Sequence, residues 1–149
     1  MAITASINVR PATPDDLAFV SRDGQLPAER IARMIADGHI YLATSNAEPA
    51  GYARIEYLWS KFPFVALIWV LEQHRRHGVG RALLTAIERD ARMAGHEFLY
   101  SSSQADEPLP QAWHRRMGFA ECGLIAGFNR GGVGEIFFRK PLVESAAAG

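Results

Sequence analysis

The chain has 149 residues, of which 48% are hydrophobic and 21% are charged. This length is typical of one domain with one sizeable core, and the composition excludes a disordered, collagen-like or coiled-coil chain. Sixteen Lys and Arg residues balance sixteen Asp and Glu residues, which argues against a general nucleic-acid or membrane-surface binder. An anion must therefore be bound by a local arrangement of donors.

The single cysteine and the N-terminal residues indicate a reducing compartment. Cys122 has no partner for an internal disulfide, and the first residues lack the basic-then-apolar order of a signal peptide. The longest apolar stretch, Phe62–Leu71, is far shorter than the roughly 20 residues of a membrane helix. We therefore expect a soluble, cytoplasmic protein with one domain over residues 1–142 and a flexible tail over residues 143–149.

Hydrophobic periodicity and turn residues divide the chain into strands and helices. In chain order we expect a strand at 7–10, helices at 14–22 and 27–37, strands at 40–44, 51–59 and 64–71, a helix at 80–94, a strand at 98–102, a helix at 110–117 and strands at 120–128 and 135–140. The order β-α-α-β-β-β-α-β-α-β-β predicts an α/β fold with a mixed central sheet flanked by helices. The helix at 80–94 should join a parallel pair of strands.

Two of these strands carry specific expectations about burial. Phe64–Leu71 is apolar at every position, which predicts a central strand covered on both faces. In the strand at 51–59, residues such as Ala53 and Ile55 alternate with a polar face that contains Arg54 and Glu56. Four aromatic residues in this region should lie mostly in the core, although one or two are candidates to line an acceptor pocket: Tyr52, Tyr57, Trp59 and Trp69.

The segment Val70–Leu84 is the most informative part of the chain for function. It runs from a buried strand through a basic, glycine-containing loop into a helix, and a helix N-terminus offers unpaired N–H groups and partial positive charge to a phosphate. Arg75, Arg76, His77 and Arg81 add donors that suit a diphosphate. The segment matches neither the P-loop nor the dinucleotide fingerprint. The alternative interpretation is an ordinary strand-to-helix turn with solvated cations.

The loop Arg75–Gly80 resembles the Gln/Arg-x-x-Gly-x-Gly/Ala signature of the GNAT superfamily of N-acetyltransferases. Val9–Leu17 and Ala112–Phe119 are also similar to family motifs, and the element order agrees from about residue 7 to residue 142. The resemblance implies a GNAT-like fold and an acyl-coenzyme A donor, acetyl-CoA in the simplest case. The acetyl group would pass to a primary amine by direct attack in a ternary complex, and no metal is implied.

The resemblance also implies which residues bind the donor. The pyrophosphate would lie on the N–H groups of Arg76–Arg81, and the pantetheine arm would run between the strand that ends at Leu71 and the strand at 98–102. A free main-chain N–H near Val70 or Leu71 would hold the thioester carbonyl as it gains negative charge. The expected donor-binding residues are Val70, Leu71, Arg75, Arg76, His77, Gly78, Val79, Gly80 and Arg81. Many members carry glycine at the position of Arg76, so a positive φ there would alter the loop slightly.

Two proton-transfer roles need residues, because the amine must lose a proton and the departing thiolate gains one. The family usually has a tyrosine acid four places before the Gly of Gly-Phe, and this chain has His114 there. We predict that His114 is the acid, through an imidazolium or a neutral N–H; its alternative role is structural. The strand at 64–71 has no ionisable residue, so Glu56 is the candidate base, with ion pairing to an arginine as its alternative role.

Other side chains near the predicted site have less specific roles. Ser101, Ser102 and Ser103 are candidates to bind the pantetheine amides or the acceptor, or only to cap a turn. Cys122 is expected to pack in a strand. Arg130, in a glycine-rich hairpin, is expected to be solvated, with a gate at the acceptor mouth as its alternative role.

Three other hypotheses remain open. The first is the same fold with a different acyl group or acceptor. A catalytically weak CoA-binding or sensing module would explain the histidine in place of tyrosine. A nucleic-acid binder would use four arginines, although the zero net charge argues against it: Arg75, Arg76, Arg115 and Arg116. The acceptor is either a small-molecule amine or a protein amine. Exposed sheet edges commonly pair, so a homodimer is one of the two oligomeric states we consider.

Overall fold

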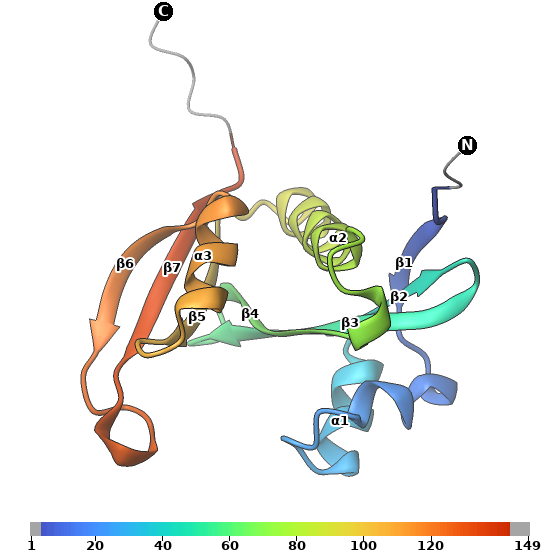
Figure 1. The fold of residues 1–149 in the computed structure, drawn as a ribbon, viewed down its shortest axis with the longest axis horizontal. Helices are drawn as coiled ribbons and strands as arrows, with labels where there is room; N and C mark the ends of the chain where they lie inside the picture. The colour runs from blue at the N-terminus through green and yellow to red at the C-terminus, as the bar shows by residue number, and fades with distance from the viewer. Residues whose placement is uncertain (1–3, 144–149) are drawn as a thin grey trace, which may run out of the picture. The chain divides into compact units, whose positions relative to one another are not determined.

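The computed structural model describes residues 4–143, and the chain divides into two compact units. Unit 1 comprises residues 1–56 and 67–87, and unit 2 comprises residues 57–66 and 88–149. The chain passes from one unit to the other within β3, β4 and α2, which are labelled in Figure 1. One domain over residues 1–142 stays a prediction, and residues 144–149 of the expected tail lie outside the described residues.

The elements follow the predicted order except at the first predicted helix. The strands are β1 (Ile7–Pro11), β2 (Ile40–Ser45), β3 (Glu48–Leu58), β4 (Phe62–Val70), β5 (Phe98–Gln104), β6 (Ala120–Ile125) and β7 (Glu135–Pro141). The α-helices are α1 (Ala28–Ala36), α2 (Val79–Met93) and α3 (Pro108–Arg116), and the 3₁₀ helices are η1 (Pro14–Asp16), η2 (Phe19–Ser21), η3 (Glu72–His74) and η4 (Arg130–Gly132). Hydrogen bonds join the strands in the order β1-β2-β3-β4-β5-β7-β6. The β4–β5 pair is parallel and the β1–β2, β2–β3, β5–β7 and β6–β7 pairs are antiparallel, which confirms the mixed sheet.

The helix expected at residues 14–22 is wrong, because η1 and η2 replace it. Polar side chains compete for the backbone groups that a longer helix needs. The Asp16 carboxylate accepts a hydrogen bond from the Thr13 N–H at 2.7 Å and pairs with Arg10, and the Ser21 hydroxyl donates to the Leu17 carbonyl. These local bonds satisfy the backbone in two short turns.

Strand β3 is buried on both faces from Ala50 to Ile55, including the face that the sequence predicts to be polar. Tyr52 and Arg54 of β3 are both buried there. Tyr52 and Leu42 share one apolar core with α1, which contributes Ile31, Met34 and Ile35. The expectation of a polar, solvated face is therefore wrong at Arg54. Of the four aromatic residues expected mostly in the core, Tyr52 is buried, Trp69 is half-buried, and Tyr57 and Trp59 are exposed.

In unit 2, α3 packs against one face of the β5–β7 pair, as Figure 1 shows. The ring of His114 on α3 stacks on Phe138 of β7, with 4.5 Å between centroids, and Leu99 of β5 is also buried. Strand β6 is exposed along its whole length, so the expectation that Cys122 is a packing residue is wrong. Unit 2 therefore has its apolar core on the α3 side of the sheet.

None of the helices in residues 4–143 combines the length and the apolar character that crossing a bilayer requires.

Candidate active site

The loop between β4 and α2 has the geometry of an anion-binding helix start. The first hydrogen bond into α2 runs from the Ala82 N–H to the Gly78 carbonyl at 3.0 Å, so the N–H groups just before Ala82 have no partner within the helix. The first turn of α2 contains no acidic residue. Arg75, Arg76 and Arg81 are exposed around this turn. Exposed arginines and helix N–H groups without a partner in the helix thus occur at one place in unit 1.

Two residues of this loop adopt left-handed backbone conformations. Gly78 has φ +89°, which suits a residue without a Cβ atom. Arg76 has φ +66°, in the region that most side chains avoid. The loop therefore requires a positive φ at the position where many GNAT members carry glycine. Arg76 meets this requirement at an energetic cost.

The end of β4 corrects one expectation about the thioester carbonyl. The Leu71 N–H is not free, because it donates to the Ala50 carbonyl at 2.9 Å. The Val70 carbonyl accepts a hydrogen bond from the Arg75 Nε at 3.1 Å, so this arginine anchors the loop to the strand end. Of the two residues expected to supply the free N–H, Val70 is the one that remains a candidate.

Strand β4 is not covered on both faces, contrary to its uniformly apolar sequence. Ala66 is exposed, and the segment from Leu67 to Val70 is half-buried. The half of β4 that leads into the loop therefore keeps accessible apolar surface. Accessible surface of this kind in a central strand is what a bound ligand would cover.

His114 lies in unit 2 and is 6% exposed. Its Nδ1 is 2.7 Å from the Pro110 carbonyl oxygen, and its Nε2 is 2.8 Å from the Ser101 Oγ. Because a carbonyl oxygen can only accept, Nδ1 carries the hydrogen, and Nε2 of the neutral ring accepts from the Ser101 hydroxyl. Burial lowers the pKa of His114, against opposing effects of the Pro110 carbonyl and the Glu135 charge. The resting side chain is therefore a neutral imidazole.

The Ser101 hydroxyl has a second acceptor within reach, so the hydrogen bond between Ser101 and His114 can persist when His114 is protonated. Its Oγ lies 3.1 Å from the Val65 carbonyl oxygen. If His114 takes up a proton, Nε2 becomes a donor to Ser101, and the serine hydroxyl can then donate to Val65. Both protonation states of the imidazole thus keep their hydrogen bonds.

Glu56, the other predicted proton-handling residue, is half-buried near the end of β3 in unit 1. It lies two residues beyond Arg54, which pairs with Ile40 at the end of the β2–β3 ladder. Within residues 4–143 no lysine or arginine forms an ion pair with Glu56, and the neighbouring Arg54 pairs with Asp23 instead. The alternative role as an arginine partner is therefore not seen in the described part of the chain.

The other two serines of β5 differ from Ser101. Ser102 donates to the Oε2 of Glu135 on β7 at 2.9 Å, and the Asn129 side-chain amide donates to its Oε1 at 3.1 Å. The Ser103 hydroxyl is buried and has no hydrogen-bond partner among the described residues. Sequence reasoning missed Glu135, because its partner Ser102 is 33 positions away in the chain.

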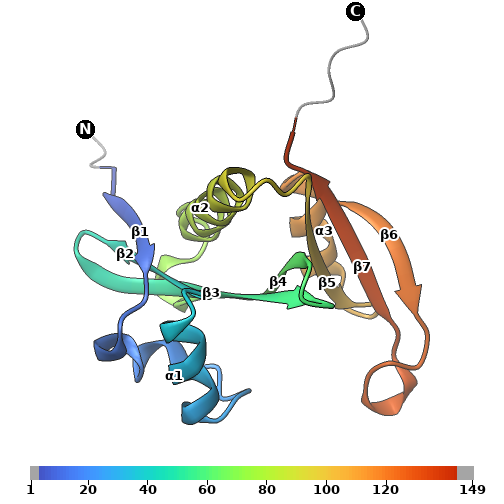
Figure 2. The ribbon, with the colours of Figure 1, turned by 180° about the vertical axis from the view of Figure 1, so that it is seen from behind.

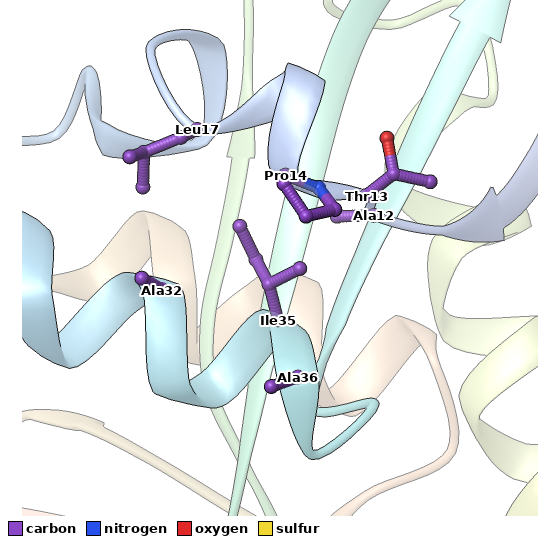
Figure 3. Close-up of a pocket in the computed structure, with 7 residues that line it drawn as sticks. All are labelled: Ala12, Thr13, Pro14, Leu17, Ala32, Ile35 and Ala36. Atoms are coloured by element: carbon purple, nitrogen blue, oxygen red, sulfur yellow. The ribbon is translucent and has the colours of Figure 1, made fainter.

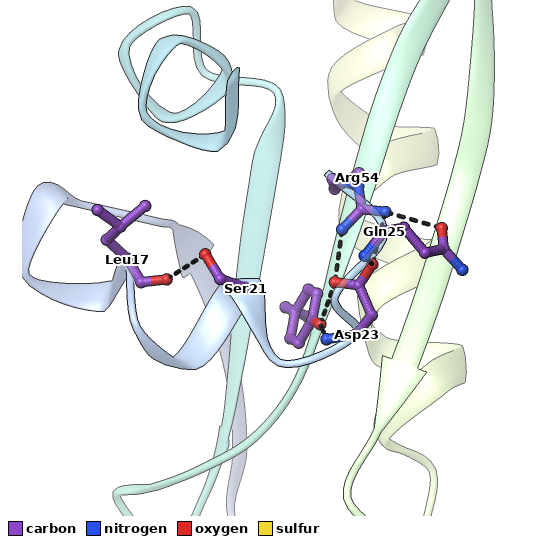
Figure 4. Close-up of polar contacts among 6 residues, drawn as sticks. Leu17, Ser21, Asp23, Gln25 and Arg54 are labelled. Carbon is purple, nitrogen blue, oxygen red and sulfur yellow. Dashed lines mark hydrogen bonds and ion pairs between the residues drawn. The ribbon is translucent and has the colours of Figure 1, made fainter. Parts of the chain in front are cut away.

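Sequence reasoning also missed a buried ionic cluster in unit 1, drawn in Figure 4. Asp23, in the loop before α1, forms an ion pair with Arg54 at 2.7 Å, and the Tyr52 hydroxyl donates to Asp23 at 2.5 Å. Burial alone would raise the pKa of Asp23, but the hydrogen bonds from Arg54 and Tyr52 outweigh it and hold that pKa below its usual value. Burial and the Asp23 charge raise the pKa of Tyr52. The cluster ties the loop to β3.

A separate hollow of about 240 Å³ in unit 1 lies between η1 and α1, as Figure 3 shows. Its lining is apolar except for Thr13: Ala12, Thr13, Pro14, Leu17, Ala32, Ile35 and Ala36. It contains no group suited to proton transfer or to phosphate binding. We therefore assign it no part in the candidate site.

The predicted site residues fall into two groups. Val70, Leu71, the loop from Arg75 to Arg81 and Glu56 belong to unit 1, whereas His114 belongs to unit 2. The loop residues are brought together at the start of α2.

Comparison with known proteins agrees with these features. The Acetyltransferase (GNAT) family matches residues 11–119. The chain is 30% identical to an aminoglycoside N(6')-acetyltransferase type 1 of Stenotrophomonas maltophilia, over 97% of this chain and 99% of that protein. It is 34% identical to a streptothricin acetyltransferase of Streptomyces lavendulae, over 82% of this chain and 62% of that protein.

A solved structure supports the fold. A Salmonella typhimurium protein, yncA, solved with its cofactor acetyl-CoA, superposes with a TM-score of 0.74 over 95% of this chain and 96% of that chain, at 19% identity. At this identity the likeness concerns the fold alone. Together with the family match over most of the sequence, it leads to one conclusion: the chain belongs to the GNAT family of acetyltransferases.

Proposed function

We propose that the protein transfers an acetyl group from acetyl-CoA to a primary amine of a cationic small molecule. The observation that carries the proposal is the loop at the start of α2. Its positive φ values at Arg76 and Gly78 turn the chain into a helix start that has no acidic residue in its first turn and is surrounded by exposed arginines. This combination suits the pyrophosphate of coenzyme A.

The donor-binding roles follow from position in this loop. The backbone from Arg76 to Arg81 would bind the pyrophosphate, with His77, Gly78, Val79 and Gly80 contributing main chain, and Arg75 would keep the loop against the Val70 carbonyl. The half-buried end of β4 near Val70 and Leu71 would lie along the pantetheine arm. A main-chain N–H at Val70 is our candidate for holding the thioester oxygen, because Leu71 already donates to Ala50.

Proton transfer in the proposed reaction needs two acceptors. Glu56, acting through water, would take one proton from the incoming ammonium so that the nitrogen can attack. When the C–N bond forms and the C–S bond breaks, His114 would accept a second proton through Ser101 and return it to the thiolate. Two observations support this exchange: the imidazole is neutral, and the Ser101 hydroxyl has two acceptors within reach, His114 Nε2 and the Val65 carbonyl oxygen.

The acceptor class is taken from the relatives. Their names give aminoglycosides and streptothricin as the substrates of similar proteins, and both are small molecules that carry amino groups. We propose the same class for this chain, with a cytoplasmic reaction that uses no metal, nucleic acid or membrane. A homodimer is the oligomeric state we propose, because the edge strand β6 is exposed along its length.

The decisive test compares two glycine variants of equal backbone strain. Gly78 and Gly95 have φ +89° and φ +87°, and an added Cβ would meet nothing closer than 3.8 Å at Gly78 and nothing within 4 Å at Gly95. We expect Gly78→Ala to weaken acetyl-CoA binding tenfold or more in calorimetry, because the side chain crowds the phosphate, and Gly95→Ala to leave it unchanged. Equal affinities would remove the loop from the donor site.

A second measurement separates an enzyme from a binding module. Purified protein is incubated with acetyl-CoA and a panel of aminoglycosides, streptothricin, simple amines and peptides, and released thiol is recorded. Thiol release that depends on one amine class is expected. Tight acetyl-CoA binding without thiol release on any amine would favour the binding module, and no uptake of acetyl-CoA would refute the proposal.

A further inference from the structure

The sheet of unit 2 has one face that no helix of that unit covers. Successive side chains of a strand point to opposite faces of the sheet. Leu99 and Ser101 of β5 are buried on the face that α3 covers, so the residues between and beside them lie on the opposite face. That face carries Tyr100, Ser102 and Gln104 from β5, and all three are half-buried. Figure 2 views unit 2 with β7 in front of α3.

Aromatic rings and one carboxylate occupy this uncovered face, and Arg139, which lies over the Phe98 ring at 4.2 Å, is its cation at the opposite end of β7 from Glu135. Phe137 and Glu135 are alternate residues of β7, so they share a face, and Phe137 contacts the ring of Phe64 on β4 with 5.9 Å between centroids. Phe64 pairs in register with Tyr100, which places the three rings on the same side. The face is therefore a half-buried aromatic surface with Glu135 at one end.

Neutral donors hold the Glu135 carboxylate on both of its oxygens. The Ser102 hydroxyl donates to Oε2 at 2.9 Å and the Asn129 amide donates to Oε1 at 3.1 Å. These donors come from β5 and from the β6–β7 loop, so the carboxylate is oriented from two sides. Each oxygen retains capacity for a further hydrogen bond.

No cation neutralises this carboxylate in residues 4–143. Glu88, a buried carboxylate of unit 2, is by contrast paired with Lys140 at 2.5 Å. Glu135 has no lysine or arginine in such a pair within the described residues. A half-buried, oriented anion beside aromatic faces is complementary to an ammonium group, because both the carboxylate and the ring faces attract it.

We propose that Glu135 binds an ammonium group of the acceptor and thereby selects acceptors with two or more amino groups. An amine held as an ammonium by Glu135 has no free electron pair, so a different amino group of the same molecule must attack the thioester. The aromatic surface of Phe64 and Phe137 would contact the body of the acceptor. The inference rests on the proposed function and adds the residue and the charge requirement for the acceptor.

The test uses two variants that remove one negative charge each from unit 2. Glu135→Gln keeps the size of the side chain, and Glu97→Gln is the control at an exposed carboxylate. Neomycin, an aminoglycoside with several amino groups, is titrated into protein saturated with coenzyme A. We expect a tenfold or larger loss of neomycin affinity in Glu135→Gln and none in Glu97→Gln. Ser102→Ala should cause a smaller loss, because it leaves the charge but removes one orienting bond.

Kinetics give the second readout. For any polyamine that the wild-type protein acetylates, Glu135→Gln should raise KM tenfold or more with kcat within about twofold, because the interaction is made before and during the reaction alike. Equal neomycin affinity in Glu135→Gln and Glu97→Gln, no neomycin binding to the wild type, or a best acceptor with a single amino group would each overturn the inference. Acetyl-CoA calorimetry on the same samples reports the proposed function separately, since donor binding does not involve Glu135.

Discussion

The buried ion pair between Asp23 and Arg54 offers a test of how unit 1 is held together. Its side chains are 4% and 3% exposed, and the Nη1 to Oδ1 distance is 2.7 Å. The surface pair Arg10–Asp16 has the same 2.7 Å contact, but the Arg10 side chain is 47% exposed. The two pairs therefore differ mainly in burial, which makes the surface pair a matched control.

Removing one partner of the buried pair should be costly, because it leaves the other charge buried and uncompensated. Arg54→Met is expected to lower the free energy of unfolding by about 3–5 kcal/mol. For a chain of this size, that loss corresponds to a fall in Tm of about 6–20 °C, at about 2–4 °C for each kcal/mol. Arg10→Met should cost about 1 kcal/mol or less.

The coupling free energy between Asp23 and Arg54 is obtained from urea denaturation of four proteins: the wild type, Arg54→Met, Asp23→Leu and the double variant. The double variant should be more stable than the sum of the single losses predicts, because it buries no unpaired charge. Additive losses, or equal losses for Arg54→Met and Arg10→Met, would refute the reasoning.

The pH dependence of the same pair has a definite sign. The pKa of Asp23 is lowered in the folded state, so the contribution of its carboxylate is complete above the unfolded pKa of about 3.9 and is lost as pH falls through the lower folded pKa. The stability difference between the wild type and Asp23→Asn should therefore shrink below about pH 4. A difference that stays constant in acid would contradict this assignment.

Three further predictions follow from local geometry. Gly51→Ala would place a Cβ 2.7 Å from the Trp69 carbonyl oxygen and should cost about 1–3 kcal/mol of unfolding free energy in urea, whereas Gly123→Ala, with nothing within 4 Å, should cost little. Arg76→Gly should be more stable than Arg76→Ala by about 1 kcal/mol, because both remove the charge but only glycine accepts φ +66° without strain; equal stabilities would contradict the strained loop. His114→Phe should lower kcat with acetyl-CoA affinity nearly intact. Burial lowers the pKa of His114, so we expect the kcat of the wild type to fall with decreasing pH only below the ordinary histidine pKa of about 6.5. His114→Phe should abolish this fall. An unchanged kcat in the variant would show that His114 is structural.

Elements with a repeating local signal were predictable from the sequence. The periodicity and the terminal Gly95 located α2, and the strand, loop and helix around Arg75–Gly80 could be found because all of their determinants are adjacent in the chain. The prediction of a helix at 14–22 was wrong for a reason that is also local. Asp16 and Ser21 satisfy backbone groups in two short turns instead of extending one helix.

Burial along β3 and β4 could not be predicted from alternation alone. Arg54 reads as a solvated residue until Asp23, 31 positions earlier, supplies its counter-charge. The apolar run of β4 reads as fully covered, yet its segment from Leu67 to Val70 is only half-buried. In both cases burial depends on which distant segment packs on the strand.

The sequence by itself determined the family, most of the order of the elements and the position of the loop that we propose binds the pyrophosphate, because each of these depends on residues that are neighbours along the chain. The tertiary structure alone decided which polar side chains are paired. It brought Ser101 to His114, Asp23 to Arg54, and Ser102 with Asn129 to Glu135. Hydrogen bonds and ion pairs act over a few ångströms in space, and strand register and helix packing, rather than spacing in the sequence, set those distances.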